Sequence, residues 1–169
     1  MAIVRDAAAG PRAAARGATL LQLRDPDATT RSLQREALRL VAGTPLPVVV
    51  SARADLALAA GAAGVHLPEW DLPVAAARRL LPGRMVGRSV HSVAEAVRAA
   101  DEGADYVVFG PVFASRSHPG QPAAGLAALR EVAAAVPLPV LAIGGVDAAR
   151  AADCRDAGAA GFAAIGYFS

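Results

Sequence analysis

The sequence predicts a (β/α)₈ barrel, also called a TIM barrel, that lacks its last helix and forms a single domain over residues 1–169. Short apolar runs alternate with stretches of helical periodicity along the whole chain. Runs such as Tyr106–Phe109 are apolar on both faces, which suits a parallel strand that is covered on either side. Because each parallel strand needs a crossover connection, strict alternation favours a parallel barrel. An open doubly wound sheet is the structural alternative.

The first half of the chain contains four strand and helix pairs. Apolar runs predict strands at 2–4, 19–23, 48–50 and 64–66, and helical patterns follow at 7–16, 30–41, 53–60 and 73–81. The second helix places four apolar side chains on one face, those of Leu33, Ala37, Leu40 and Val41. Pro45 and Pro47 separate this helix from the third strand, and Pro73 suits the first turn of the fourth helix.

The second half continues the alternation, with strands predicted at 85–87, 106–109, 140–143 and 161–165. Ser92 and Glu95 have the spacing of a capping box, so a helix is expected to begin at Ser92 and to end before Gly103. Its apolar face is predicted to consist of Ala94, Val97, Ala100 and the neighbouring alanines. Helices are also expected at 125–136 and 148–157.

The predicted eighth strand is not followed by a helix, since three residues remain after Gly166. We therefore expect either a truncated chain or a last strand that a partner covers. Uncovered apolar barrel surface favours association, which makes a homodimer the expected oligomer.

Composition excludes several classes of function. The net charge is +2 and the arginines are scattered, so we expect no nucleic-acid partner. The chain has no lysine, which excludes Schiff-base catalysis by a lysine side chain. A single cysteine, Cys154, allows neither a disulfide framework nor a cysteine-type zinc site. Without a signal peptide or an apolar run of about 18 residues, the protein is expected to be cytoplasmic and to contact no membrane.

Glycines follow the last two predicted strands. Gly144 and Gly145 come directly after the strand at 140–143, and Gly166 follows the strand at 161–165. Glycine lets the backbone approach a phosphate group and donate N–H groups to it. In parallel barrels the loops after the seventh and eighth strands often bind phosphate. The alternative is that both are tight turns that need glycine for backbone reasons alone.

Polar side chains lie at the expected carboxyl ends of several strands. Gln22 and Arg24 alternate with the apolar Leu23, so they point the same way and suit an anionic or heteroaromatic ligand, although a solvated strand end would look the same. Arg88, Ser89 and His91 follow the fifth strand, and Ser115, Ser117 and His118 follow the sixth.

Three histidines, His66, His91 and His118, come after successive strands, where imidazole groups suit general acid and base catalysis. The carboxylates near strand ends, Asp25, Asp27 and Asp71, do not have the spacing of a metal site.

These segments together resemble one known family. The quoted stretches are QLRD at 22–25, ADLALAAGAAGVHLPEWDLP at 54–73, GRSVHS at 87–92, GADYVVFGPVF at 103–113 and PLPVLAIGG at 137–145. In order and spacing they resemble the thiamine-phosphate synthase / TenI family. The resemblance implies a TIM barrel, a role in thiamine biosynthesis and a phosphorylated thiazole as ligand. It also favours a phosphate site made by Gly144, Gly145, Ile165 and Gly166.

Synthases of this family join a pyrimidine diphosphate to a thiazole phosphate with the help of Mg²⁺, and several of their characteristic residues are replaced here. The lysine of their QLREK segment is Pro26, their NDR segment is Ser51, Ala52 and Arg53, and the lysine of the loop after the sixth strand is His118. Asp71 keeps the other metal-binding position.

The TenI branch resembles this chain through GRSVHS, and its characterised members are metal-independent thiazole tautomerases. The histidine that follows FG in those enzymes is Pro111 here. Losing a carboxylate and two cations is expected to impair a step that must neutralise a departing pyrophosphate. We therefore expect a TenI-like thiazole tautomerase that needs no cofactor. His118, or else His91, would move the proton.

The other residue roles follow from the same resemblance. Five side chains would bind the substrate ring and carboxylate, those of Gln22, Arg24, Ser89, Ser115 and Ser117. Two alternatives stay open: a thiamine-phosphate synthase that binds Mg²⁺ at Asp71, and a barrel that binds thiazole or thiamine phosphates without catalysis.

Overall fold

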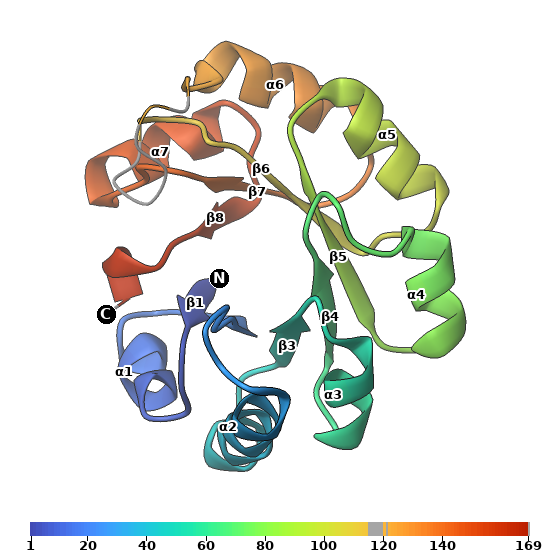
Figure 1. The fold of residues 1–169 in the computed structure, drawn as a ribbon. Coiled ribbons are helices and arrows are strands. Elements are labelled where there is room, and N and C mark those ends of the chain that lie inside the picture. Colours follow the sequence, from blue (N-terminus) through green and yellow to red (C-terminus); the bar gives the residue numbers. More distant parts are fainter. Residues whose placement is uncertain (115–119, 121, 169) are drawn as a thin grey trace.

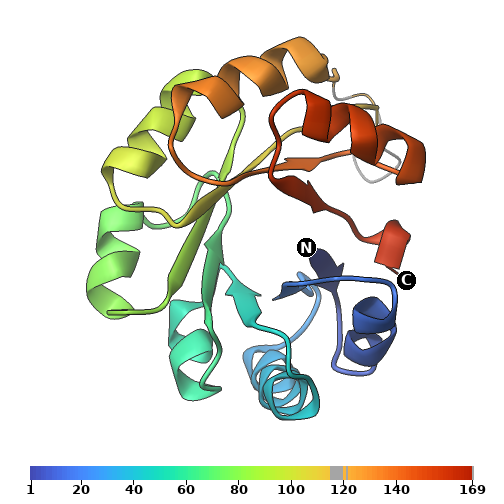
Figure 2. The same ribbon diagram turned by 180° about the vertical axis from the view of Figure 1, so that it is seen from behind.

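The structure, a computed structural model, describes residues 1–114, 120 and 122–168. Eight parallel strands form one sheet in the order β1 to β8, and a bridge between Ala2 and Ala164 joins its two edges. Within the described residues, seven α-helices alternate with the strands and surround them on the outside (Figures 1 and 2). The predicted TIM barrel is confirmed.

The observed elements match the predicted order. The strands are β1 Ala2–Val4, β2 Leu21–Leu23, β3 Val48–Ser51, β4 Gly64–Leu67, β5 Met85–Val90, β6 Tyr106–Phe109, β7 Val140–Ile143 and β8 Gly161–Ala163. The helices are α1 Ala9–Ala15, α2 Thr30–Gly43, α3 Ala54–Ala59, α4 Val74–Leu80, α5 Val93–Asp101, α6 Gly125–Ala135 and α7 Ala148–Asp156. A 3₁₀ turn, η1, covers Gly166–Phe168 after β8.

The largest difference from the predicted strands is the length of β5, which continues through Arg88 and Ser89 to Val90. Polar side chains at these positions suggested a loop, but the barrel uses both of them inside the strand. Ser89 pairs in register with Val108 of β6, and Arg88 pairs with Val107. The fifth strand therefore carries polar groups at the barrel end where ligands bind in this fold.

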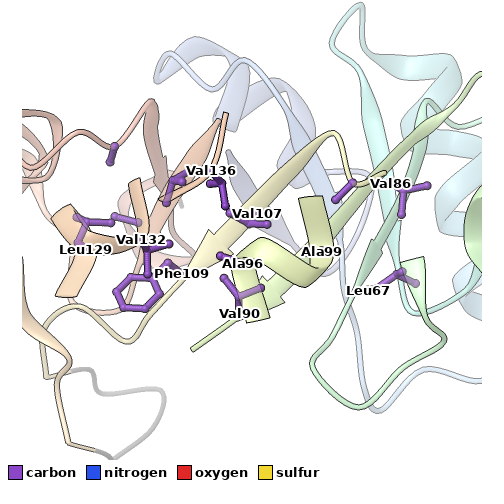
Figure 3. Packing of buried hydrophobic residues seen from close by; sticks show 14 of the residues in the cluster. Leu67, Val86, Val90, Ala96, Ala99, Val107, Phe109, Leu129, Val132 and Val136 are labelled. Carbon is purple, nitrogen blue, oxygen red and sulfur yellow. The ribbon is translucent and has the colours of Figure 1, made fainter. Parts of the chain in front are cut away.

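Side chains alternate along each strand between the helices and the barrel interior. Outward-facing strand residues pack against the helices in one cluster, and Figure 3 shows Val90 of β5 near Ala96 of α5 and Phe109 of β6 near Val132 of α6. The interior holds a smaller apolar cluster that includes Met1, Tyr106, Val108 and Ala163. The apolar interior leaves little room for polar groups, so those that do lie inside need a hydrogen-bond partner.

The face that helix α5 presents to the sheet matches the predicted one only in part. Ala96 and Ala99 are buried and Ala100 packs against the core, whereas Ala94 is exposed and Val97 is 37% exposed. Alanine recurs on almost every side of this helix, so hydrophobic periodicity does not fix its orientation. The predicted cap is present: the N–H of Glu95 donates to Ser92 Oγ at 3.3 Å.

The outer surface next to β1 and β8 is covered by aromatic side chains from the end of the described chain. Phe168 is buried and stacks on Phe162 with 5.7 Å between ring centroids, and Tyr167 contacts both rings at their edges. Figure 1 shows η1 between α7 and α1, where a regular barrel has a further helix. Among the described residues, no helix is long and apolar enough to cross a membrane.

Gly87 is required by the packing of the barrel interior. A Cβ atom at this position would lie 2.1 Å from Cζ of Tyr106 on the neighbouring strand. Gly87 and Tyr106 are direct partners in the register of β5 and β6. The tyrosine ring therefore occupies the space that any larger residue at position 87 would need.

We expect Gly87→Ala to lower the free energy of unfolding by about 3 kcal/mol, because the added methyl group overpacks the interior. Gly43→Ala is the matched control, since a Cβ atom there meets no atom within 4 Å. The control should be neutral or slightly stabilising, as alanine favours a helix over glycine. Urea denaturation measures both, and equal stabilities for the two variants would contradict the packing argument.

Candidate active site

Three polar residues, among those that the structure describes, are buried, and all three lie on neighbouring strands of one side of the barrel. Gln22 is on β2 and 3% exposed, Ser51 is on β3 and 8% exposed, and His66 is on β4 and 3% exposed. Ser51 and His66 are direct partners in register. The Gln22 side chain has no hydrogen-bond partner among the described residues. A buried amide with unused donors and acceptors suits the recognition of a polar ligand.

His66 is the centre of a hydrogen-bonded chain across three strands. Its Nδ1 lies 3.2 Å from the hydroxyl of Tyr106, and its Nε2 lies 2.9 Å from Ser89 Oγ. Burial, and to a smaller extent the charges of Arg88 and Arg24, lowers the pKa of His66 from 6.5 to about 3. Burial also raises the pKa of Tyr106, so the phenol keeps its proton. The imidazole is therefore neutral and holds the Ser89 hydroxyl in place.

The sequence indicated His66 as one of three histidines at strand ends but gave no sign of Tyr106 as its partner. The two residues are forty positions apart, and they meet because β5 pairs with both β4 and β6 and carries Gly87 between them. Ser89, a predicted substrate-binding residue, belongs to this chain of polar groups through its contact with His66. Its role toward a substrate stays a prediction.

His91 lies at the mouth of the barrel with both ring nitrogens near acceptors. Nδ1 donates to the carbonyl of Gly110 at 2.5 Å, and Nε2 is 3.4 Å from a carboxylate oxygen of Glu69. Its backbone N–H donates to Glu95 at 2.6 Å. His91 thus connects the loops after β4, β5 and β6. The other candidates of the sixth loop, Ser115, Ser117 and His118, lie outside the described residues.

The loop after β7 has open backbone N–H groups. Gly144 and Gly145 adopt the left-handed region, with φ of 94° and 63°, and a Cβ atom on Gly144 would lie 2.7 Å from Pro111. The N–H groups of Gly144, Gly145 and Val146 have no acceptor among the described residues. Successive free N–H groups in such a turn form an anion-binding concavity, and α7 begins directly after it. Ile165 and Gly166 follow β8, which neighbours β7 in the sheet.

Asp71 lies in the loop after β4 and is the carboxylate best suited to a metal ion. Its Oδ1 accepts from the N–H of Leu72 at 2.7 Å, whereas its Oδ2 is buried without a hydrogen-bond partner among the described residues. Arg88 holds this loop by donating to the carbonyls of Leu72 at 2.7 Å and Glu69 at 2.5 Å. The described residues contain no cluster of three or more metal-binding side chains. A single carboxylate fits Mg²⁺ that is shared with substrate phosphates and water.

Arginines near the rim differ in whether a carboxylate already binds them. Arg5 contacts Asp25 and Asp27, each at 2.5 Å, and its hydrogen bond holds the pKa of Asp25 below its usual value. Arg53 is paired with Asp55 at 2.7 Å. Arg24 is exposed, and its guanidinium has no partner among the described residues. Of the three arginines that follow the ends of β1, β2 and β3, Arg24 is therefore the cation available to an anionic ligand.

Known proteins resemble this chain over almost its whole length. A family model described as thiamine monophosphate synthase matches residues 4–168. The chain is 51% identical over 158 residues to a thiamine-phosphate synthase of Methanoculleus marisnigri, covering 90% of this chain and 75% of that protein. It is 51% identical over 154 residues to one of Anaeromyxobacter dehalogenans, covering 88% and 69%. A solved structure of thiamine phosphate pyrophosphorylase from Pyrococcus furiosus superposes with a TM-score of 0.87 at 32% identity, covering 97% and 83%.

These relatives correct the activity that the sequence suggested. The expectation of a metal-independent thiazole tautomerase is wrong, because the similar proteins are named as synthases. The expectation that no cofactor is needed stays a prediction.

The buried His66 makes stability depend on pH. Below pH 6.5 the unfolded chain takes up a proton at this imidazole, whereas the folded protein does so only near its pKa of about 3. The free energy of unfolding therefore falls as pH drops below 6.5, by up to about 1.4 kcal/mol per pH unit. Above that pH the group contributes no pH dependence.

We expect His66→Gln to lose this component, since glutamine keeps polar atoms in the interior but does not titrate. Urea denaturation of the wild type and the variant between about pH 7 and pH 5 measures the difference in slope. Identical pH dependence of the two proteins would show that His66 is not a buried neutral imidazole.

Proposed function

The chain belongs to the thiamine monophosphate synthase family, and we propose that it is a thiamine-phosphate synthase. In this reaction a bond forms between the pyrimidine and thiazole units, and the bond that breaks releases pyrophosphate. One observation carries the proposal. Within the described residues, the same barrel end holds a loop whose N–H groups have no acceptor and the Asp71 carboxylate, whose Oδ2 has no hydrogen-bond partner. A reaction between two phosphorylated substrates needs an anion site and a metal site, whereas metal-free proton transfer does not need the carboxylate.

The glycine loops are proposed to bind the phosphate of the thiazole substrate. Gly144 and Gly145 supply N–H groups that have no acceptor among the described residues, and Ile165 and Gly166 lie on the β8 side of the same rim. Backbone donors bind a phosphate without a side-chain cation. This arrangement suits a chain that has no lysine.

The buried polar groups are proposed to orient the pyrimidine. The Gln22 amide has no hydrogen-bond partner in the part of the chain that the structure describes, and Ser89 is fixed by the neutral His66. Both lie inside the barrel, where their polar groups disfavour an apolar ligand and can form hydrogen bonds with the nitrogen atoms of a heteroaromatic ring. Arg24 is proposed to bind diphosphate oxygens. The same substrate is also proposed to contact Ser115, Ser117 and His118. We further propose that residues 1–169 act as one catalytic domain.

Asp71 is proposed to hold Mg²⁺ together with the diphosphate. When bound, the ion supplies the positive charge that stabilises the departing pyrophosphate. The contribution of the chain is to keep Asp71 in position, because the Arg88 guanidinium donates to the carbonyls on both sides of it. The buried Oδ2 lacks a competing hydrogen bond within the described part of the chain.

We expect purified protein to form thiamine phosphate from pyrimidine diphosphate and thiazole phosphate, and to stop when EDTA removes Mg²⁺. Asp71→Asn should lower kcat by about 100-fold, because the amide keeps the shape but not the charge of the metal ligand. Asp101→Asn, at the exposed end of α5, is the control and should retain full activity. Coupled product and pyrophosphate assays measure the rates. Turnover that survives EDTA, or thiazole phosphate binding without turnover, would contradict the proposal.

Position 52 offers a gain-of-function test. Ala52 adopts φ of 62°, a left-handed conformation that asparagine and aspartate tolerate better than alanine. It also occupies the place where synthases of this family have a Mg²⁺-binding aspartate. We expect Ala52→Asp to lower the half-saturating Mg²⁺ concentration by about tenfold, since a second carboxylate attracts the cation.

The control is Ala52→Gly, which relieves the same backbone conformation without adding charge. It should raise stability by about 1 kcal/mol and leave the Mg²⁺ dependence unchanged. A Mg²⁺ titration of initial rates compares the two variants with the wild type. If Ala52→Asp responds to Mg²⁺ as the glycine variant does, then position 52 does not face the metal site.

A further inference from the structure

Helix α7 carries an arginine that none of the proposed roles uses. Arg150 lies in the first turn of the helix, where its backbone N–H donates to Asp147 Oδ1 at 2.9 Å. Its side chain turns back toward the loop after β7, and Nη1 donates to the carbonyl of Gly145 at 2.8 Å. The guanidinium carbon lies 4.8 Å from the ring centroid of Phe113. One exposed side chain therefore joins α7, the β7 loop and the loop after β6.

The bond to the Gly145 carbonyl determines where the next N–H group points. In a trans peptide the C=O and the following N–H lie on opposite sides. Because Arg150 binds the Gly145 carbonyl, the N–H of Val146 points away from the Arg150 guanidinium. Glycine has more conformational freedom than any other residue, so two glycines in succession need an external restraint to keep one conformation. Arg150 is such a restraint.

The aromatic contact anchors the arginine itself. The N–H of Phe113 donates to the carbonyl of Gly144 at 3.0 Å, and a Cβ atom on Gly145 would lie 2.9 Å from Cβ of Phe113. A guanidinium stacked on an aromatic face gains cation–π attraction and loses side-chain freedom. The carbonyls of both glycines are thus held by neighbours, one by Phe113 and one by Arg150, while the N–H groups of 144–146 stay without acceptors among the described residues.

We propose that Arg150 is a positioning residue of the phosphate subsite, which fixes the Gly145–Val146 peptide so that the N–H of Val146, with those of Gly144 and Gly145, binds the phosphate of the thiazole substrate. The inference rests on the proposed function and deepens it. Its guanidinium also places a positive charge beside the subsite in a chain without lysine. Because Arg150 acts through this loop, its removal should weaken binding of the phosphate group and leave binding of the thiazole ring unchanged.

Isothermal titration calorimetry with two probes separates these contributions: thiazole phosphate, and the thiazole alcohol that lacks the phosphate. We expect Arg150→Ala to weaken binding of the phosphorylated probe by about tenfold, the loss expected for one charged hydrogen bond, and to leave binding of the alcohol unchanged. Arg150→Lys keeps the charge and one donor, and should recover part of the affinity. Arg155→Ala is the matched control, because Arg155 is exposed in the last turn of α7 and has no side-chain partner among the described residues.

Three results would overturn the inference: equal affinity of wild type and Arg150→Ala for thiazole phosphate, equal losses for both probes, or the same loss in Arg155→Ala. The first of these, with normal thiamine phosphate formation by the wild type, removes the role of Arg150 and leaves the proposed function intact. If the wild type binds thiazole phosphate without turnover, a selective loss of phosphate binding in Arg150→Ala supports the inference, whereas the synthase activity is contradicted. Absence of thiazole phosphate binding by the wild type contradicts both.

Discussion

Closure of the parallel sheet is the constraint on which every site in this protein depends. The edges meet where Ile3 donates its N–H to the carbonyl of Ala164 at 3.0 Å, next to the bridge between Ala2 and Ala164. Because all eight strands run in the same direction, closure brings their carboxyl ends to one rim. Gln22 on β2 and the glycines after β7 are far apart in the sequence, yet they belong to the same rim for this reason.

Arginine side chains hold two loops of this rim and also supply its positive charge, in a chain that has no lysine. Arg88 donates to successive carbonyls of the loop that carries Asp71, and Arg150 donates to the glycine loop. A guanidinium has several donors in one plane, so it can hold a loop through main-chain carbonyls and still carry a charge. The positive charges of Arg88 and Arg24 also help to keep His66 neutral, which leaves Ser89 with a hydrogen-bond partner that does not titrate near neutral pH.

The fold could be predicted from the sequence because strands covered on both faces, such as Tyr106–Phe109, need unbroken apolar runs. The buried face of α5 could not be predicted in full, because alanines lie on almost every side of this helix. Arg88 and Ser89 looked like loop residues, although one side chain reaches a neighbouring loop and the other points into the barrel. The contact between His66 and Tyr106 depends on the pairing of β5 with β4 and β6, so no local sequence pattern indicates it. The sequence favours the wrong branch of the family because several synthase residues are replaced while Asp71 alone is kept. That Asp71 Oδ2 has no hydrogen-bond partner among the described residues can be seen only in the structure.

The most direct test of this account is an NMR titration of ¹⁵N-labelled protein with thiazole phosphate, with the alcohol as reference. The amide resonances of Gly144, Gly145 and Val146 are expected to shift strongly with the phosphorylated ligand and little with the alcohol, since these N–H groups have no acceptor among the described residues. Shifts of equal size with both ligands, or unchanged resonances of this loop at saturation, would contradict the phosphate subsite and the function built on it.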